Sequence, residues 1–202
     1  RLATHVASGE KLLGDGGAIG RRLDFLAQEL SRDLGYFLPH IAAADDPAAP
    51  PRRYTVGPLT GLVGEWAVGP YDLAVFGPNG FYRRYAGAGG KNATAVEARF
   101  VEGKPEVELS VRGVADGDAL SVISEGYPGT LAGWTYRPKG RRENAAHRAH
   151  AWNLAVTHGW YDFTVRRAAD PTWLRRFAGR HETGADGFTD PAIGGAAVMA
   201  WA

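Results

Sequence analysis

Two segments of this chain repeat the same set of polar side chains, of types that bind anions or transfer protons. Each has a Tyr-Asp pair followed by two arginines: Tyr71, Asp72, Arg83 and Arg84 in the first, and Tyr161, Asp162, Arg175 and Arg176 in the second. Two carboxylates cleave a glycosidic bond together only within about 5–10 Å of each other. Because equivalent positions of separate modules lie far apart, a structural hydrogen bond of each aspartate with a nearby turn or a repeated arginine is favoured over catalysis.

The paired arginines are candidates for binding a phosphate or another anion. Adjacent side chains on a strand point to opposite faces, so neither pair can hold one phosphate with both guanidinium groups. One arginine of each pair is expected to pack its stem over an aromatic ring while its charged end stays in water. The candidate binding residues are Arg84, Arg176, Trp134 and Trp173. The six tryptophans indicate core positions first, although Trp134, Trp173 and Trp201 are also candidates for an exposed interfacial set.

Other patterns that resemble chemical sites are weak. Glu143, His147 and His150 have the spacing of three metal ligands on one helix face, but arginines surround them without an apolar stripe, so a solvated loop or strand is favoured. His158 and His181 stand beside predicted turns or strand ends. No nucleophile, base and orienting group occur in a recognisable pattern. The sequence therefore predicts no catalytic residue, no metal site and no cofactor.

The segments that carry the two Tyr-Asp pairs have the pattern of β-hairpins. Apolar and polar residues alternate over 71–75 and 161–165, turns with Pro-Asn-Gly or Asp-Pro follow, and an aromatic-rich strand returns. The copies lie about 90 residues apart, which is too long for a solenoid repeat and typical of a duplicated small domain.

The second of the two predicted modules, residues 93–190, is the more complete. Val107, Leu109 and Val111 alternate with polar residues, which predicts a strand with one face in water. Further short strands separated by turn residues favour a β-sandwich of immunoglobulin-like size.

The first predicted module, residues 36–90, has fewer strands and is expected to be incomplete. Before it, residues 1–35 form a Gly-rich lead and one helix over 18–34, where apolar residues at 19, 23, 26, 30 and 34 form one stripe. The expected fold is mostly β, with two immunoglobulin-like sandwich modules in tandem, the first incomplete and preceded by the helix. Residues 191–202 are expected to be a tail.

Composition excludes several classes of protein. The 202 residues are 45% hydrophobic with a net charge of +1, so nucleic acid is not an expected partner. The chain has no cysteine, which rules out disulfides and thiolate metal sites. No apolar run approaches the roughly 20 residues of a membrane span. The Arg21-Arg22 pair is followed by charged residues, so no export signal is predicted in this chain.

Four longer motifs carry a resemblance to a known family. They are YDLAVFGPNGF at 71–81, GWYDFTV at 159–165, RRFAGRHETG at 175–184 and TDPAIGG at 189–195. With them the chain resembles the C-terminal tandem-repeat region of bacterial phosphocholine-preferring phospholipases C, of the haemolytic and non-haemolytic types. The resemblance covers roughly residues 36–195, and residues 1–35 match no known segment.

The resemblance implies that the chain is one part of a larger enzyme. Members carry an N-terminal catalytic domain of the alkaline-phosphatase-like superfamily, which hydrolyses phosphatidylcholine or sphingomyelin to phosphocholine and a diglyceride or ceramide. They are exported folded, so the parent enzyme is expected to be secreted or periplasmic. None of the family's catalytic residues maps onto this chain, and a chain complete in itself would be a truncated product without hydrolase activity.

Three roles follow as hypotheses. The modules support or position the phospholipase C catalytic domain at a phospholipid surface, with exposed Trp and Arg side chains at the headgroups. Alternatively they form a protein-interaction module, or a carbohydrate-binding β-sandwich that uses its aromatic rings as stacking platforms. An independent enzyme is the least supported hypothesis.

Overall fold

The computed structural model describes residues 5–12, 21–28, 40–43, 50–53, 55, 61–66, 70–77, 80–89, 94–140, 148–182 and 186–192. Within them the first half of the chain forms β1 (His5–Leu12), β2 (Arg21–Gln28), β3 (His40–Ala43), β4 (Arg52–Arg53), β5 (Gly61–Trp66), β6 (Tyr71–Phe76) and β7 (Tyr82–Gly87). The second half forms β8 (Ala95–Phe100), β9 (Glu106–Arg112), β10 (Leu120–Ser124), β11 (Trp134–Tyr136), β12 (Ala149–Asn153), the 3₁₀ turn η3 (Ala155–Thr157), β13 (Trp160–Arg167) and β14 (Asp170–Arg180).

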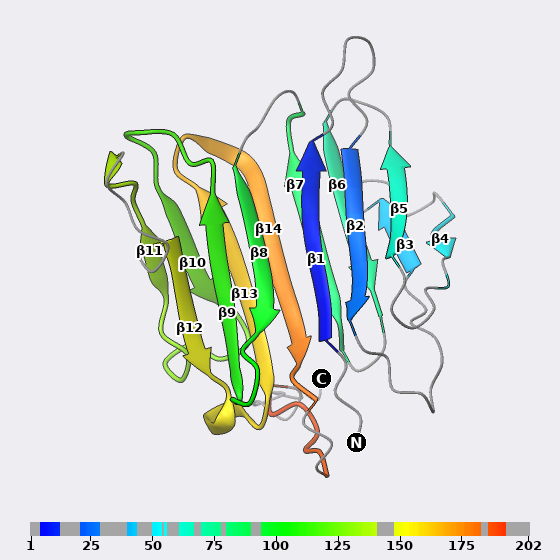
Figure 1. Cartoon of the computed structure of the whole chain (residues 1–202), viewed down its shortest axis with the longest axis vertical. Coiled ribbons are helices and arrows are strands. Elements are labelled where there is room, and N and C mark those ends of the chain that lie inside the picture. Colours follow the sequence, from blue (N-terminus) through cyan, green and yellow to red (C-terminus); the bar gives the residue numbers. More distant parts are fainter. Residues whose placement is uncertain are drawn as a thin grey trace, which may run out of the picture.

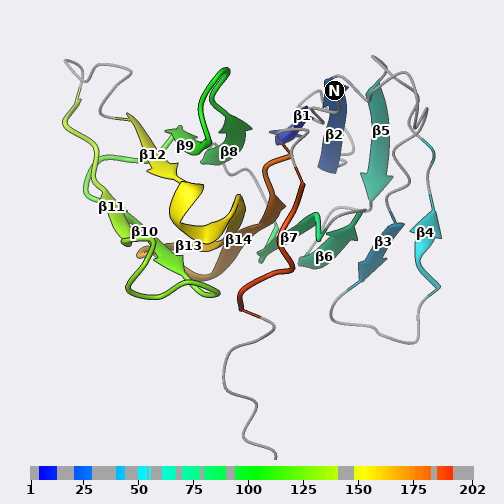
Figure 2. The same cartoon turned by 90° about the horizontal axis from the view of Figure 1, so that it is seen from below.

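These strands make two antiparallel sheets that lie face to face as a sandwich (Figures 1 and 2). One sheet has the order β12-β9-β8-β1-β2-β5, and the other has the order β11-β10-β13-β14-β7-β6-β3-β4. The expectation of a mostly-β sandwich is confirmed.

The same seven-strand pattern occurs twice, once in each half of the chain. Counted outward from the middle, each sheet repeats its order: β14, β13, β10 and β11 on one side correspond to β7, β6, β3 and β4 on the other. In the six-stranded sheet β8, β9 and β12 correspond to β1, β2 and β5. The halves meet where β14 pairs with β7 and β8 pairs with β1, so both sheets run continuously through the molecule.

The helix predicted over 18–34 is wrong, because residues Arg21–Gln28 form β2 and pair with β1 and β5. The other positions of its apolar stripe lie outside the described residues. Sheet pairing overrides local helix propensity where neighbouring strands offer hydrogen bonds on both sides. The expectation of an incomplete first module is also wrong. β1 and β2 hold the places in the first half that β8 and β9 hold in the second half.

Between the sheets lies the hydrophobic core, in which the second half contributes the larger described cluster. Val107, Leu109 and Val111 are each at most 1% exposed, which confirms the predicted one-sided strand. The opposite face of β8 and β9 carries exposed ion pairs, such as Arg99 with Glu108 at 2.6 Å. Exposed ion pairs of this kind contribute only about 0–1 kcal/mol each to stability. This face of the sheet is therefore solvated, and its ion pairs add little to the stability of the fold.

Candidate functional site

The repeated tyrosines, aspartates and arginines meet at the join of the two halves, and we call this set the arginine seam. Its members are Tyr71, Asp72, Arg83 and Arg84 of the first half and Tyr161, Asp162, Arg175 and Arg176 of the second. In the ladder between β7 and β14, Arg84 lies opposite its own counterpart Arg176. The strand pairing is therefore centred on these two arginines, and an approximate two-fold axis relates every seam contact to a second one.

On the outer face of the eight-stranded sheet each aspartate binds the second arginine of its own hairpin. Arg84 donates from Nε and Nη2 to Asp72 at 2.7 and 2.5 Å, and Arg176 donates likewise to Asp162 at 2.8 and 2.6 Å. These hydrogen bonds raise the pKa of both guanidinium groups above the ordinary arginine value. The predicted structural pairing of aspartate with arginine is thus present. An anion that binds Arg84 or Arg176 would have to compete with a carboxylate that accepts two hydrogen bonds from the same guanidinium group.

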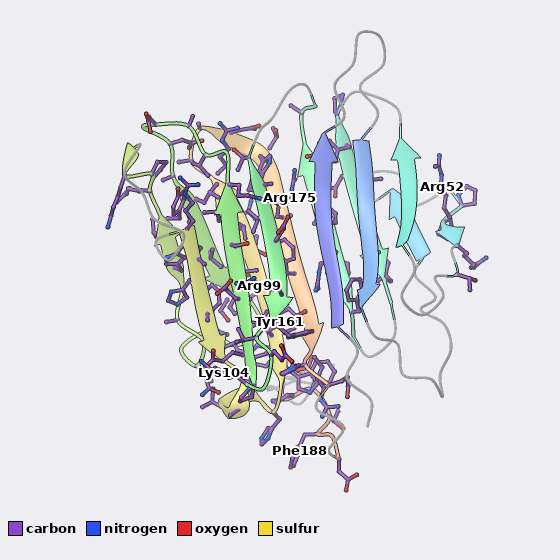
Figure 3. All side chains as sticks on the ribbon, in the orientation of Figure 1. Arg52, Arg99, Lys104, Tyr161, Arg175 and Phe188 are labelled. Carbon is purple, nitrogen blue, oxygen red and sulfur yellow. The ribbon has the colours of Figure 1, made fainter. Side chains whose placement is uncertain are left out.

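On the inner face the first arginine of each pair reaches across to the other half. Arg83 donates from Nη2 to the Tyr161 hydroxyl at 2.9 Å and from Nη1 to the Ala178 carbonyl at 2.7 Å. In the symmetric contact, Arg175 donates to the Tyr71 hydroxyl at 2.7 Å and to the Ala86 carbonyl at 2.8 Å. Arg83 and Arg175 are 1% and 2% exposed. The paired arginines do point to opposite faces as predicted, but the inner ones are buried braces between the halves (Figure 3 labels Tyr161 and Arg175).

The glycine that ends each motif makes room for the tyrosine. Tyr71 lies opposite Gly87, and Tyr161 lies opposite Gly179. A Cβ atom at Gly87 would stand 2.9 Å from the Tyr71 hydroxyl, and one at Gly179 would stand 3.3 Å from that of Tyr161. The repeated tyrosine, aspartate, arginine and glycine positions of the motif therefore all belong to the contacts of the seam. The repeat is visible in the sequence. The contacts of the inner arginines with the tyrosines of the other copy are not.

The predicted aromatic candidates lie in different environments. Trp134, on the edge strand β11, is partly buried and stacks on His150 with ring centroids 5.5 Å apart. Trp173 is only 1% exposed, so its assignment to an exposed set is wrong, and the Arg175 guanidinium covers its ring at 4.4 Å. Trp201 lies outside the described residues.

Of the three residues with the spacing of metal ligands only His150 is described, and Glu143 and His147 lie outside the described residues. Burial lowers the pKa of His150 below the ordinary histidine value. Over the part of the chain with described side chains, no three His, Asp or Glu residues are grouped so as to hold a metal ion. Among the same residues no helix is long and apolar enough to cross a membrane.

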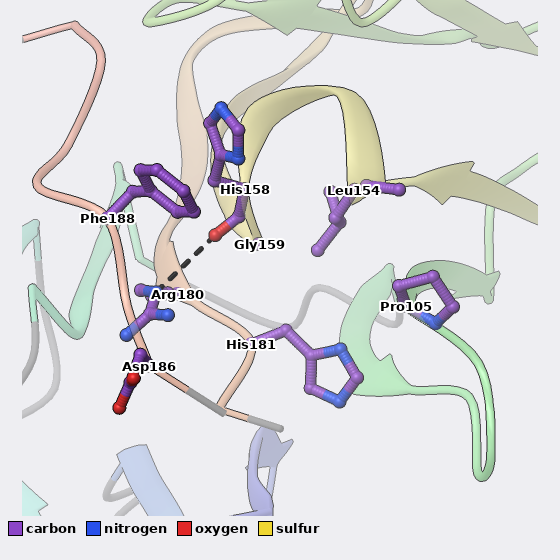
Figure 4. Close-up of a pocket in the computed structure, with 9 residues that line it drawn as sticks. Pro105, Leu154, His158, Gly159, Arg180, His181, Asp186 and Phe188 are labelled. Carbon is purple, nitrogen blue, oxygen red and sulfur yellow. Dashed lines mark hydrogen bonds between the residues drawn. The ribbon is translucent and has the colours of Figure 1, made fainter. Parts of the chain in front are cut away.

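His158 and His181 line one cavity of about 180 Å³ (Figure 4), whose lining residue Phe188 lies at the lower end of the molecule in Figure 3. His158 has a left-handed backbone with φ 54° and stacks on Phe188 with ring centroids 4.2 Å apart. Arg180 donates to the His158 carbonyl at 3.4 Å, and Asp186 lies at the rim. Phe188 lines this cavity and Val156 follows its lining residue Ala155 in the chain; at 61% and 64% they are the most exposed large hydrophobic side chains among the described residues.

A second cavity, of about 290 Å³, lies where β13 begins and β14 ends. Its walls include Tyr127, Trp160, Asp162 and Asp190. The sequence reasoning missed Tyr127 and Trp160 as site residues. Trp160 and Asp190 could have been found, because they fall within the motifs at 159–165 and 189–195, whereas Tyr127 lies in none of them.

Comparison with known proteins gives a consistent set of relatives. The family model described as "Bacterial phospholipase C, C-terminal domain" matches residues 39–88 and 95–180, one segment in each half. A "Non-hemolytic phospholipase C" of Pseudomonas aeruginosa is 33% identical over 159 residues, which cover 74% of this chain and 22% of the relative. One of Burkholderia pseudomallei is 34% identical over 161 residues, covering 71% and 21%. A "Hemolytic phospholipase C" of Pseudomonas aeruginosa is 30% identical over 137 residues, covering 63% and 18%. The chain thus spans about a fifth of the length of these relatives.

Proposed function

Because this chain belongs to the family of the bacterial phospholipase C C-terminal domain, we propose that it is a non-catalytic accessory region of such an enzyme. The parent enzyme hydrolyses phosphatidylcholine or sphingomyelin outside the cytoplasm, and this region supports or positions its catalytic domain at lipid. The relatives are about five times longer than the matched region, which leaves ample sequence for a separate catalytic domain.

The observation that carries the proposal is the use of the repeated polar residues inside the seam. Asp72 and Asp162 bind Arg84 and Arg176, and the tyrosine hydroxyls accept hydrogen bonds from buried arginines. Residues engaged in this way join two halves into one rigid platform. This supports a structural role for the repeat motif rather than a catalytic one.

The lower end of the sandwich carries side chains of the kind that lipid contact requires, which supports this proposal. Phe188 and Lys104 lie at this end (Figure 3), and more than half of the Phe188 side chain is exposed, as it is for Val156 in η3. Aromatic and aliphatic side chains beside a cationic group suit the boundary between headgroups and acyl chains. Because Trp173 is buried, Phe188 takes its place in this proposal.

Co-sedimentation with phosphatidylcholine and sphingomyelin vesicles, with phosphocholine release measured in the same tubes, tests the proposal. We expect binding without phosphocholine release. Phe188→Ser should weaken binding at least about tenfold, because burying such a side chain contributes about 1.5–3 kcal/mol. Ile123→Ser is the control, because Ile123 is 44% exposed on β10. Phosphocholine release would refute the non-catalytic role, and absence of binding would refute positioning at lipid.

A further inference from the structure

The cavity lined by His158 and His181, which we call the histidine cavity, presents an exposed aromatic ring, that of Phe188. His158 covers this ring from one side, with ring centroids 4.2 Å apart (Figure 4). The backbone that carries the ring is also held, because Trp160 Nε1 donates to the Phe188 carbonyl at 3.0 Å. More than half of the Phe188 side chain remains exposed. The cavity therefore has a flat apolar face that is fixed in place before any ligand binds.

The backbone conformation of His158 is costly for a residue with a side chain. Its φ is 54°, in the left-handed region that glycine adopts more readily. His158 ends the 3₁₀ turn η3, where its N–H donates to the Ala155 carbonyl at 3.3 Å. A glycine at this position would meet the same backbone requirement at lower cost. What the histidine adds is a polar ring that lines the cavity and supports Phe188.

Three polar side chains of the cavity wall keep hydrogen-bonding capacity. Arg180 donates from Nε to the His158 carbonyl at 3.4 Å and from Nη1 to Glu182 at 3.3 Å, but its Nη2 has no acceptor among the described residues. Within the same part of the chain, the Asp186 carboxylate accepts no hydrogen bond and the His158 imidazole makes none. Polar groups of a concave site that lack a protein partner are available to a ligand. The cavity thus offers donors and an acceptor to one ligand.

The charge and the size of the cavity narrow the class of ligand. Glu182 offsets the charge of Arg180 and Asp186 is exposed to water, so neither an anion nor a cation meets a strong opposite potential. Pro105 and Leu154 add an apolar part of the wall. Drug-sized ligands occupy cavities of about 300–1,000 Å³, whereas this cavity has about 180 Å³ and suits a single ring. The ligand that fits is an uncharged ring with an apolar face and several hydroxyl groups.

We propose that the histidine cavity binds a neutral saccharide through one pyranose ring. The C–H face of such a ring stacks on an aromatic face, here the uncovered face of Phe188. Its neighbouring hydroxyls both donate and accept, which matches Asp186 as the acceptor and Arg180 Nη2 as the donor. This site goes beyond the proposed accessory function and does not depend on it, because it is tested with soluble sugars in the absence of lipid.

The test is a titration of the chain with methyl β-D-glucopyranoside and, separately, with methyl β-D-galactopyranoside, followed by NMR of the backbone and tryptophan indole N–H groups. The Trp160 indole signal is assigned by its loss in Trp160→Phe. With at least one of the two epimers we expect a saturable shift, at millimolar concentrations, of that signal and of residues 158–159 and 186–188. D-Sorbitol, which has the hydroxyl groups but no ring, should bind at least about tenfold more weakly.

Phe188→Leu is the informative variant, because leucine keeps an apolar side chain but offers no aromatic face. We expect it to weaken binding of the glycoside at least about fivefold. Contact with lipid depends on apolar area, which leucine retains, so this variant separates the saccharide site from the proposed lipid contact.

Asp186→Ala should weaken binding of the glycoside about fivefold, because it removes the acceptor. Asp116→Ala is the matched control, since Asp116 is equally classed as exposed but lies outside the cavity wall, and its affinity should stay within about twofold. Absence of a saturable shift with both glycosides, equal binding of sorbitol, or unchanged affinity in Phe188→Leu or Asp186→Ala would each overturn the proposal. The comparison of the glycosides with sorbitol needs no variant and stands even where a substitution disturbs folding.

Discussion

Removal of the Tyr161 hydroxyl tests whether the buried arginine braces hold the two halves together. Arg83 is 1% exposed and donates to this hydroxyl at 2.9 Å. Hydrogen bonds to charged groups contribute about 1.5–3 kcal/mol, and their loss leaves a buried donor without that acceptor. Tyr161→Phe keeps the ring in place, so we expect it to lower the free energy of unfolding by about 1.5–3 kcal/mol.

Urea denaturation followed by tryptophan fluorescence measures this change. Tyr82→Phe is the matched control, because Tyr82 lies on the outer face of the same sheet, and its effect should stay within about 0.5 kcal/mol. A double-mutant cycle of Tyr161→Phe with Arg83→Met should give a coupling of about 1 kcal/mol or more. A loss in Tyr161→Phe no larger than in Tyr82→Phe, or a coupling near zero, would refute the brace.

Three further predictions concern the same framework. Burial raises the pKa of Asp118, but hydrogen bonds from Arg167 and two backbone N–H groups outweigh it and leave the pKa below the ordinary value. The ionised Asp118 carboxylate contributes its full stabilisation above the unfolded pKa of about 3.9, and this contribution is lost as the pH falls through the lower pKa of the folded state. In Asp118→Asn the urea concentration at the midpoint of unfolding should therefore fall less steeply as the pH is lowered. Gly87→Ala should cost about 1–3 kcal/mol in urea denaturation, because its Cβ would meet the Tyr71 hydroxyl at 2.9 Å, and an unchanged midpoint would contradict this. Asp72→Asn should cost less than about 1 kcal/mol, because its ion pair is partly exposed, and a loss equal to that of Tyr161→Phe would contradict it.

Local patterns in the sequence were sufficient for much of this description. Alternation predicted β9 and the hairpin β13–β14, because a strand with one buried face must place apolar residues at every second position. The repeated Tyr-Asp and Arg-Arg pairs in the sequence are the same residues that form the seam. The resemblance to the phospholipase C region rests on the same motifs, and the family match agrees with it.

Only the tertiary structure decided which half of the chain each seam residue contacts. Within one hairpin the motif predicts contacts among its own residues, and Asp72 with Arg84 follows that rule. Arg83 instead binds Tyr161, because the antiparallel pairing of β7 with β14 places the two copies around a shared axis. Such pairing depends on strands far apart in the sequence, and no local periodicity encodes it. The segment Arg21–Gln28 is a second case that local periodicity does not predict. Its apolar residues have helical spacing, but it forms a strand because β1 and β5 pair with it on either side.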